Sequence, residues 1–134
     1  MSVLSKEIKQ YMSGLTVPAD DKFTARFIFP AEFTGFQGHF PGNPILPGVC
    51  MIQAVIIMFK EFEKKITLKE ILQAKFFLPV SCNKELFFQC TRFAKKENEY
   101  LIKALITSSD KTIAKLELYL ERNNNCATQK GRIF

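Results

Sequence analysis

Residues 39–59, HFPGNPILPGVCMIQAVIIMF, join a rigid turn to a long apolar segment. The turn begins with His39, the single histidine of the chain, and three prolines and two glycines follow within the next nine residues. This composition is incompatible with regular structure as far as Leu46. Pro47 suits the first turn of a helix, where its missing N–H would have no partner. We expect this helix to run from about Pro47 to Lys64 and to be buried on every side in its apolar first half.

The rest of the chain reads mainly as β-structure. Apolar residues alternate with polar ones in several segments, which is typical of half-buried strands. Short turns between these strands predict an antiparallel meander. Strands are expected over residues 22–29, 70–78, 85–94, 100–107 and around 114–120, and a short amphipathic helix over residues 2–13.

These elements predict a single α+β domain over residues 1–122, with one long central helix against a curved antiparallel sheet. No repeat, linker or break in composition divides the chain. The fractions of hydrophobic residues, 47%, and of charged residues, 24%, are ordinary for a globular domain. The polar residues 123–134 are expected to form a flexible C-terminal tail.

Composition also limits the location and partners. The N-terminus lacks the apolar core of a signal peptide, and the longest apolar run, residues 49–59, is too short to cross a bilayer. We therefore expect a cytoplasmic protein that does not enter a membrane. The net charge of +6 favours an acidic partner. Nucleic acid is the generic candidate and an acidic protein fits at least as well, so charge alone does not choose between them. Because no nucleic-acid-binding motif appears, we expect no nucleic-acid partner.

Cysteine usage gives no sign of a metal site. The four cysteines lack CxxC spacing, and one histidine is too few to complete a zinc site with them. We expect reduced thiols and no metal or redox cofactor.

A lone histidine is more often structural than catalytic, but the surroundings of His39 favour chemistry. The second Pro-Gly pair, Pro47 and Gly48, opens the apolar helix. The free N–H groups and the positive dipole end of that helix therefore lie close in sequence to the imidazole. A base beside an anion-binding helix end suits the formation of an enolate from a thioester.

Residues 38–48, GHFPGNPILPG, resemble the signature of the 3-hydroxyacyl-acyl-carrier-protein dehydratases of fatty-acid synthesis. That family has the hot-dog fold, in which a curved sheet wraps a central helix. The resemblance extends more weakly along the chain, since Phe76, Pro79 and Val80 look like the family's F-x-x-P-V segment.

The resemblance implies specific roles. His39 would remove the α-proton of a 3-hydroxyacyl thioester, and the N–H of Gly48 would polarise its carbonyl. A carboxylate on the helix of a partner subunit would then help to expel the hydroxyl group as water. The remaining candidates for substrate binding are Phe40, Pro47, Val49 and Phe76, although a phenylalanine in a strand is more often plain core.

The chain departs from the family at Gln53, which stands where the carboxylate is expected. Glutamine cannot donate a proton to a leaving oxygen, and general acid assistance is commonly worth about 10²–10⁴ in rate. Glu61 lies roughly 12 Å farther along the helix axis and cannot replace it, nor can Glu63. Glu32, outside the helix, is a candidate replacement. The segment SCNK, residues 81–84, also replaces the family's Pro-Gly-Asp turn.

Gln53 has two interpretations. It is either a core residue whose amide is satisfied by the backbone or by a dimer mate, or it faces the substrate and holds a hydroxyl group or a water. We favour the second, because Gln53 is the only polar side chain in the apolar half of the helix.

Several functions follow from these observations. The first is a 3-hydroxyacyl thioester dehydratase, acting in fatty-acid or related acyl-chain biosynthesis, in which His39 performs both proton transfers. The second is a subunit that needs a hot-dog partner to supply the acid. The third is a non-catalytic module that binds an acyl chain or acyl carrier, and the fourth is a hot-dog thioesterase, which Gln53 disfavours.

The expected substrate is a thioester of acyl carrier protein or of coenzyme A, and the expected assembly is a homodimer, a larger oligomer of dimers or a hetero-oligomer. Basic residues are candidates for a surface that docks an acidic carrier, with a solvated charged face as the alternative. They are Lys75, Lys84, Arg92, Lys95 and Lys96.

Overall fold

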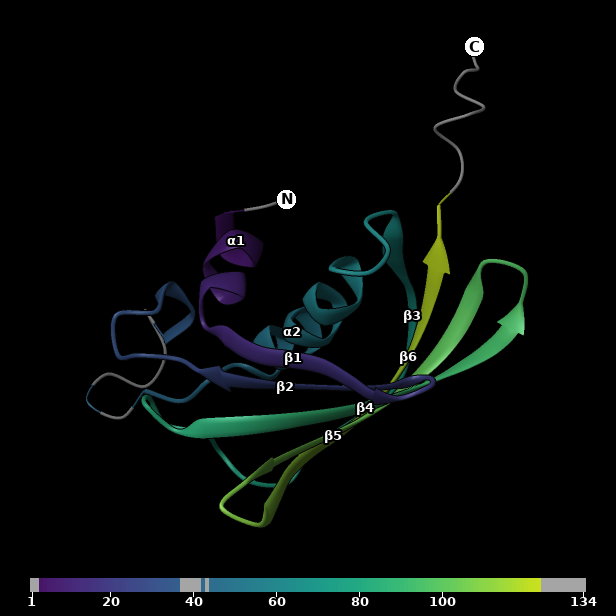
Figure 1. The fold of residues 1–134 in the computed structure, drawn as a ribbon. Helices are drawn as coiled ribbons and strands as arrows, with labels where there is room; N and C mark the ends of the chain where they lie inside the picture. The colour runs from purple at the N-terminus through teal and green to yellow at the C-terminus, as the bar shows by residue number, and fades with distance from the viewer. Residues whose placement is uncertain (1–2, 37–41, 43, 124–134) are drawn as a thin grey trace.

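The computed structural model describes residues 3–36, 42 and 44–123, and within them one long helix lies on the concave side of a curved sheet (Figure 1). The predicted α+β arrangement is confirmed. Most of the predicted C-terminal tail, residues 124–134, lies outside the described residues. The elements in chain order are α1 (Val3–Gln10), β1 (Met12–Ala19), β2 (Lys22–Ile28), the 3₁₀ helix η1 (Thr34–Phe36), α2 (Gly48–Lys60), β3 (Ile66–Phe76), β4 (Glu85–Lys96), β5 (Glu99–Ser108) and β6 (Lys111–Arg122).

All neighbouring strands of the sheet are antiparallel, in the order β1-β2-β4-β5-β6-β3. β4, β5 and β6 form the predicted meander. The prediction was wrong for β3, which does not neighbour β4 but pairs with β6 at the far edge. Pro79 has no N–H to continue a ladder, and the segment after it leaves the sheet, with the N–H of Leu46 donating to the carbonyl of Val80 (2.8 Å). The connection to β4 is thereby held beside the start of α2.

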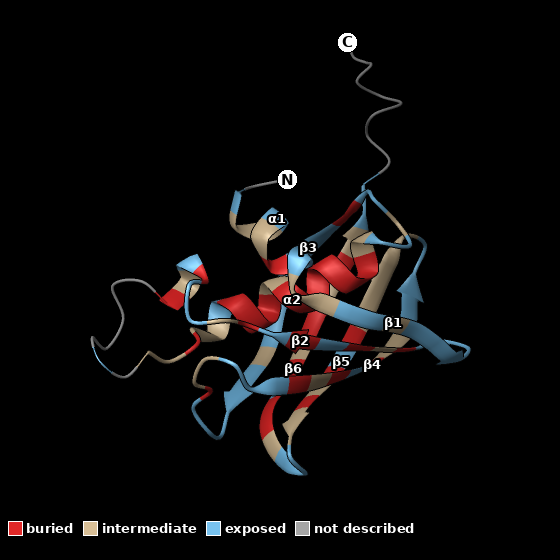
Figure 2. Ribbon diagram, turned by 60° about the vertical axis from the view of Figure 1, so that its left-hand side comes forward, coloured by how far each residue is buried: buried red, intermediate tan, exposed pale blue. Residues whose placement is uncertain are grey.

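α2 is buried along nearly its whole length (Figure 2). Full burial of one large apolar side chain contributes about 1.5–3 kcal/mol, and no side chain caps the N-terminus, so apolar packing is what holds this helix. The helix starts one residue after Pro47 and ends at Lys60, earlier than the predicted Lys64. It stops there because the following N–H groups turn back onto the last turn. The N–H of Glu61 donates to the carbonyl of Met58 (3.4 Å), and the N–H of Phe62 donates to that of Phe59 (3.0 Å).

The strand faces follow the predicted alternation. In β2 and just after it, Phe23, Ala25, Phe27 and Phe29 are all buried against the helix side of the sheet. The same holds for every second residue of β6, namely Ala114, Leu116, Leu118 and Leu120. Several of the 14 phenylalanines form one aromatic core cluster, in which the Phe27 ring stacks on that of Phe29 with centroids 5.8 Å apart.

The N-terminal region differs most from the prediction. The first helix ends at Gln10, and residues 12–19 form strand β1 at the sheet edge, where no strand was expected. β1 lacks a clear alternation because most of its residues are exposed and its pairing with β2 is irregular on both sides of Thr16. Gly14 adopts a positive φ of 62°, and Pro18 lies near the strand end.

Within the described ranges, no helix is long and apolar enough to cross a membrane. The same part of the chain contains no group of three or more His, Cys, Asp or Glu side chains arranged to bind a metal. Cys50, Cys82 and Cys90 are free thiols.

Candidate functional site

The predicted site residues divide into two groups. His39 and Phe40 lie outside the described residues. Pro47, Gly48 and Val49 form the start of α2, and Gln53 follows one turn later on the same helix. Phe76, at the end of β3, lies against this helix start, so residues distant in sequence do meet here.

The N-terminus of α2 presents backbone donors that have no acceptor within the helix. Pro47 precedes it in an extended conformation, with φ −64° and ψ 142°. Its carbonyl accepts the N–H of Cys50 (3.0 Å). The N–H groups of Gly48 and Val49 have no acceptor inside the helix, because the first N–H groups of a helix have none. Together with the helix dipole they make this end suited to a partial negative charge on an oxygen.

Gly48 is favoured here by its neighbour Phe76. A Cβ atom at this position would lie 2.5 Å from Cζ of the Phe76 ring and under 3 Å from two further ring atoms. The missing side chain therefore lets the ring pack directly over the helix start. Beside this contact opens a pocket of about 220 Å³, lined by Ile45, Leu46, Gly48, Met51, Phe76, Phe77, Leu78 and Pro79. The side chains that line it are all apolar, which suits an acyl chain rather than a charged ligand.

Gln53 is partly exposed, and the described part of the chain has no fully buried polar residue. The prediction that the first half of α2 is buried on every side is therefore wrong for the single chain. The helix is covered by the sheet and by α1 on its other faces, whereas the side with Val49, one turn before Gln53, is open and leaves Val49 58% exposed. Gln53 lies on this open side of α2, beside the helix start.

The carboxylates of α2 do not approach Gln53. Glu61, beyond the last turn, pairs with Lys9 (Nζ–Oε2 3.0 Å), and Glu63 pairs with Arg122 (Nε–Oε2 2.9 Å). Both are held at the C-terminal end of the helix, as the spacing in the sequence predicted.

A carboxylate that sequence reasoning missed lies nearer to the helix start. Glu7, on α1, accepts the N–H of Thr34 (3.0 Å). Its charge, after burial, raises the pKa of the Cys50 thiol to about 11. Glu32, the candidate replacement, is exposed, and together with burial and Glu7 its charge raises the pKa of Tyr11. The only sequence signal for Glu7 was its place in an amphipathic helix.

The segment that replaces the family's Pro-Gly-Asp turn is a turn of a different kind. Asn83 adopts a left-handed conformation (φ 63°), which asparagine tolerates better than most residues. Its N–H donates to the carbonyl of Phe29 (2.7 Å). This turn therefore ties the start of β4 to the end of β2 and brings Lys84 to the surface.

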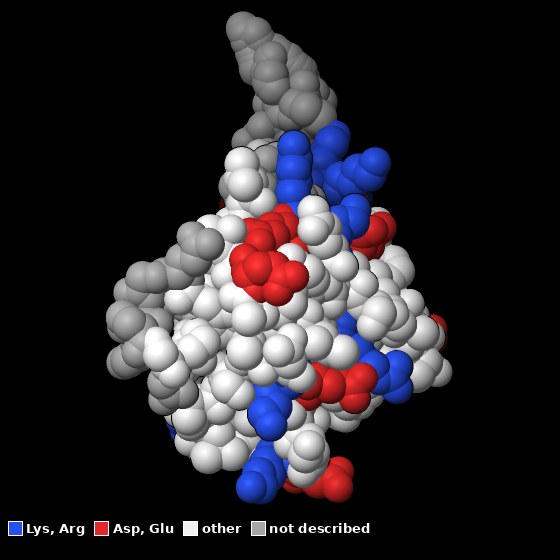
Figure 3. Space-filling view, turned by 90° about the vertical axis from the view of Figure 1, so that its left-hand side faces the viewer, with Lys and Arg blue, Asp and Glu red and all other residues white. Residues whose placement is uncertain are grey.

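The charged residues are mixed rather than gathered in a single field. Figure 3 shows acidic and basic side chains next to each other toward the top and the bottom of one face, with uncharged side chains between them. Arg92, a predicted docking residue, is engaged structurally. Its guanidinium pairs with Asp21 (Nη2–Oδ1 2.9 Å) and lies over the rings of Phe23 and Tyr100, 5.1 and 5.3 Å from their centroids.

Comparison with known proteins identifies the family. Residues 16–124 match the model of the ApeI-like family, described as ApeI dehydratase. The chain is 32% identical over 97 residues to the 3-hydroxyacyl-[acyl-carrier-protein] dehydratase FabZ of Campylobacter fetus, and 34% identical over 91 residues to that of Pediococcus pentosaceus. Both alignments cover 62% of this chain but only 66% and 61% of the two relatives, less than two thirds of their length.

Solved structures support the same fold. The dehydratase heterocomplex ApeI:P from Xenorhabdus doucetiae matches with a TM-score of 0.73 at 22% identity, over 83% of this chain and 96% of that one. Cj0977 from Campylobacter jejuni matches with a TM-score of 0.69 at 8% identity, over 90% of this chain and 96% of the other. These likenesses confirm the hot-dog fold. Because the family model spans most of the sequence, this chain belongs to the ApeI-like dehydratase family.

Proposed function

We propose that this protein is a dehydratase of 3-hydroxyacyl thioesters, with acyl carrier protein or coenzyme A as the carrier, in fatty-acid or related acyl-chain synthesis. The observation that carries the proposal is the family match over residues 16–124, joined to an open helix N-terminus beside an apolar pocket. In this mechanism His39 removes the α-proton, and the developing enolate oxygen is stabilised by the N–H of Gly48.

The leaving hydroxyl group needs a proton, and Gln53 has none to give. We assign the second proton transfer to His39 as well. The imidazolium formed in the first step returns its proton to the hydroxyl group, which leaves as water, while the Gln53 amide holds that oxygen. The partial exposure of Gln53 on the open side of α2 is compatible with this role.

A second candidate function follows from the apolar edge of the sheet. β3 and the segment after it expose large apolar side chains where no other strand covers them, namely Leu68, Ile71, Leu72, Phe76, Phe77 and Leu78. An exposed apolar edge strand is a favoured surface for pairing with another chain. We infer that a second subunit pairs along β3 and covers the open side of α2.

This subunit can be a copy of the chain or a different hot-dog protein. A different protein would supply the missing carboxylate, and the ApeI:P structure, named a dehydratase heterocomplex, is a precedent for such a pair in a similar fold. In the homodimer two Gln53 side chains are present and no helix carboxylate is.

The test is a hydration and dehydration assay on acyl thioesters of several chain lengths. The wild type should convert them slowly, and His39→Ala should abolish conversion. Gln53→Glu restores the acid and should raise the rate by about 10²-fold or more. Gln89→Glu, the same change at an exposed strand position, is the matched control and should change nothing.

The outcomes separate the candidates. Activity that appears only on co-expression with a hot-dog partner supports the second function and removes the need for His39 to act alone. Thioester binding without turnover, unchanged by Gln53→Glu, would leave only a non-catalytic acyl-binding module. Hydrolysis to the free acid would instead identify a thioesterase.

A further inference from the structure

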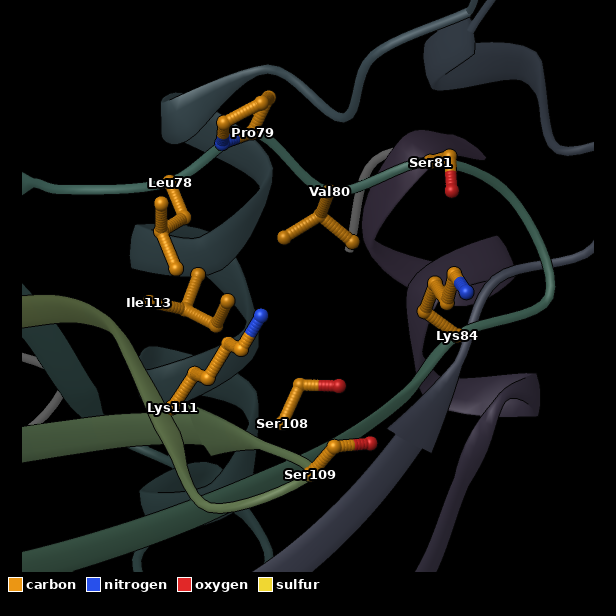
Figure 4. Close-up of a pocket in the computed structure, with 9 residues that line it drawn as sticks. All are labelled: Leu78, Pro79, Val80, Ser81, Lys84, Ser108, Ser109, Lys111 and Ile113. Atoms are coloured by element: carbon orange, nitrogen blue, oxygen red, sulfur yellow. The ribbon is translucent and has the colours of Figure 1, made fainter.

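A second pocket lies where the segment after β3 meets the turn between β5 and β6 (Figure 4). Its volume is about 390 Å³. One wall is apolar, and the other carries two lysines and three serines. The lining residues are Leu78, Pro79, Val80, Ser81, Lys84, Ser108, Ser109, Lys111 and Ile113.

The polar side of this pocket has cationic groups that form no ion pair within the part of the chain that the structure describes. Neither Lys84 nor Lys111 forms an ion pair with a described residue. The nearest acidic residue in sequence to Lys84 is Glu85, whose carboxylate is directed to Arg26 (3.8 Å). Figure 4 shows the two lysines on either side of the space, with the hydroxyl groups of Ser108 and Ser109 below and Ser81 above. The pocket therefore favours an anion.

The backbone fixes these groups in place. Ser109 and Asp110 both adopt positive φ, 50° and 66°, in a two-residue turn that connects the paired residues Ser108 and Lys111. The hydroxyl group of Ser108 donates to the carbonyl of Glu85 (2.8 Å), which ties the turn to β4. Ser81 and Ser109 remain as hydroxyl donors, and the tight turn sets the position of Lys111.

This pocket adjoins the apolar pocket at the start of α2, because Leu78 and Pro79 line both. A ligand with its anionic end between the lysines can therefore extend past residues 78–79 toward Gly48. Phosphopantetheine has the matching chemistry. Its phosphate ester is separated by one CH₂ group from a carbon with two methyl groups, which suits a cationic site with Val80 and Ile113 on its apolar wall.

We propose that Lys84 and Lys111 bind the phosphate ester of the pantetheine arm of the substrate. This inference rests on the proposed function for the identity of the ligand, and the pocket alone supports a phosphate ester. The same group occurs in coenzyme A and on an acyl carrier protein, so the chemistry of the site is shared by both carriers.

The test compares two double variants of the full chain. Lys84→Gln/Lys111→Gln removes the cations of this pocket. Lys103→Gln/Lys115→Gln is the matched control, since both lysines line another surface pocket of similar size, about 330 Å³, that also contains Glu117. Each variant removes two positive charges and so lowers the net charge from +6 to +4. Any difference between them therefore reports on position and not on total charge.

Binding of 4′-phosphopantetheine and of pantetheine is measured by calorimetry at low salt. The wild type and the control should bind the phosphorylated ligand about tenfold more tightly, which is what two partly exposed charge pairs supply. The Lys84→Gln/Lys111→Gln variant should bind both ligands equally. A phosphate preference that survives in this variant overturns the proposal, as does a wild type with no preference.

Turnover identifies the source of the phosphate. If the site binds the phosphate of both carriers, the Lys84→Gln/Lys111→Gln variant should raise KM about tenfold for coenzyme A thioesters and for carrier-protein thioesters alike. If the site binds the phosphate of one carrier alone, KM should rise for the thioester of that carrier and stay unchanged for the other. No rise for either overturns the proposal. The calorimetry needs no turnover. An inactive protein with a lysine-dependent phosphate preference would therefore refute the proposed function alone, and an active one without that preference would refute only this inference.

Discussion

The contact between Gly48 and Phe76 gives a prediction that can be worked out from distances. In Gly48→Ala the new methyl group would stand 2.5, 2.8 and 2.9 Å from three atoms of the Phe76 ring. These separations are below van der Waals contact, so the ring must move. It has room to do so because Phe76 is 45% exposed. Overpacking that forces such a shift costs typically about 1–3 kcal/mol, and we expect a value near the lower end.

A double-mutant cycle isolates this cost. In a Phe76→Ala background the ring is absent, and Gly48→Ala should be neutral or stabilising by up to about 1 kcal/mol, because alanine favours the helix. The coupling energy between the two positions should therefore be about 1 kcal/mol or more. Urea unfolding followed by circular dichroism measures it, at one fixed protein concentration because association shifts apparent stability.

The matched control uses Phe77→Ala. Phe77 lines the same pocket and is similarly exposed, at 51%, but none of its atoms is among the three nearest to the Gly48 Cβ position. Gly48→Ala should therefore cost the same in the Phe77→Ala background as in the wild type. An equal cost of Gly48→Ala in the wild type and in the Phe76→Ala background would refute the reasoning, since the ring would then not be the obstacle.

Two further predictions follow from side-chain pKa values. Burial raises the pKa of Cys50 to about 11 and that of Cys90 to about 12. Iodoacetamide at pH 8 should therefore alkylate both thiols far more slowly than half-buried Cys82 in the native protein, whereas the three rates should be similar in urea. Equal rates in the native protein would contradict this prediction. Peptide mass spectrometry gives the three rates. The hydrogen bond from Lys69 lowers the pKa of Glu99, so this carboxylate stabilises the fold above its unfolded pKa of about 4.3 and ceases to do so as the pH falls through the lower folded value. Glu99→Gln should flatten the decline of stability between about pH 5 and pH 3, measured by urea unfolding, and an unchanged slope would contradict this.

Regular alternation explains which strands could be predicted. In β2 and β6 every second residue is apolar and buried, so one face is fixed by sequence alone. β3 was predicted to begin at residue 70, although it starts at Ile66, because its apolar residues fall on both faces and most are exposed. A strand whose residues are almost all exposed has no single buried face and hence no regular alternation. Strand order was hidden for a related reason, since no local signal shows that β3 returns to β6.

The sequence predicted where the helix at the candidate site begins, but it did not predict which side chains of that helix are exposed. The Pro-Gly pair located the helix start within one residue, because Pro47 and Gly48 have conformational preferences that act locally. The burial of the first half of α2 was overestimated because exposure depends on what covers the helix, and apolar neighbours in sequence do not specify that. Glu7 was missed since it approaches the start of α2 from a separate helix.

The overestimated burial of α2 and the misplaced position of β3 have the same physical cause. Gln53 lies on the side of α2 that the sheet leaves open, and β3 is the sheet edge that exposes apolar side chains. The opposite edge, β1, is irregularly paired and contains Pro18, features that discourage association. Association is therefore favoured at one edge and opposed at the other. A subunit that pairs with β3 would also supply whatever group faces Gln53, so the identity of that subunit decides whether the leaving hydroxyl group meets a carboxylate or a second amide.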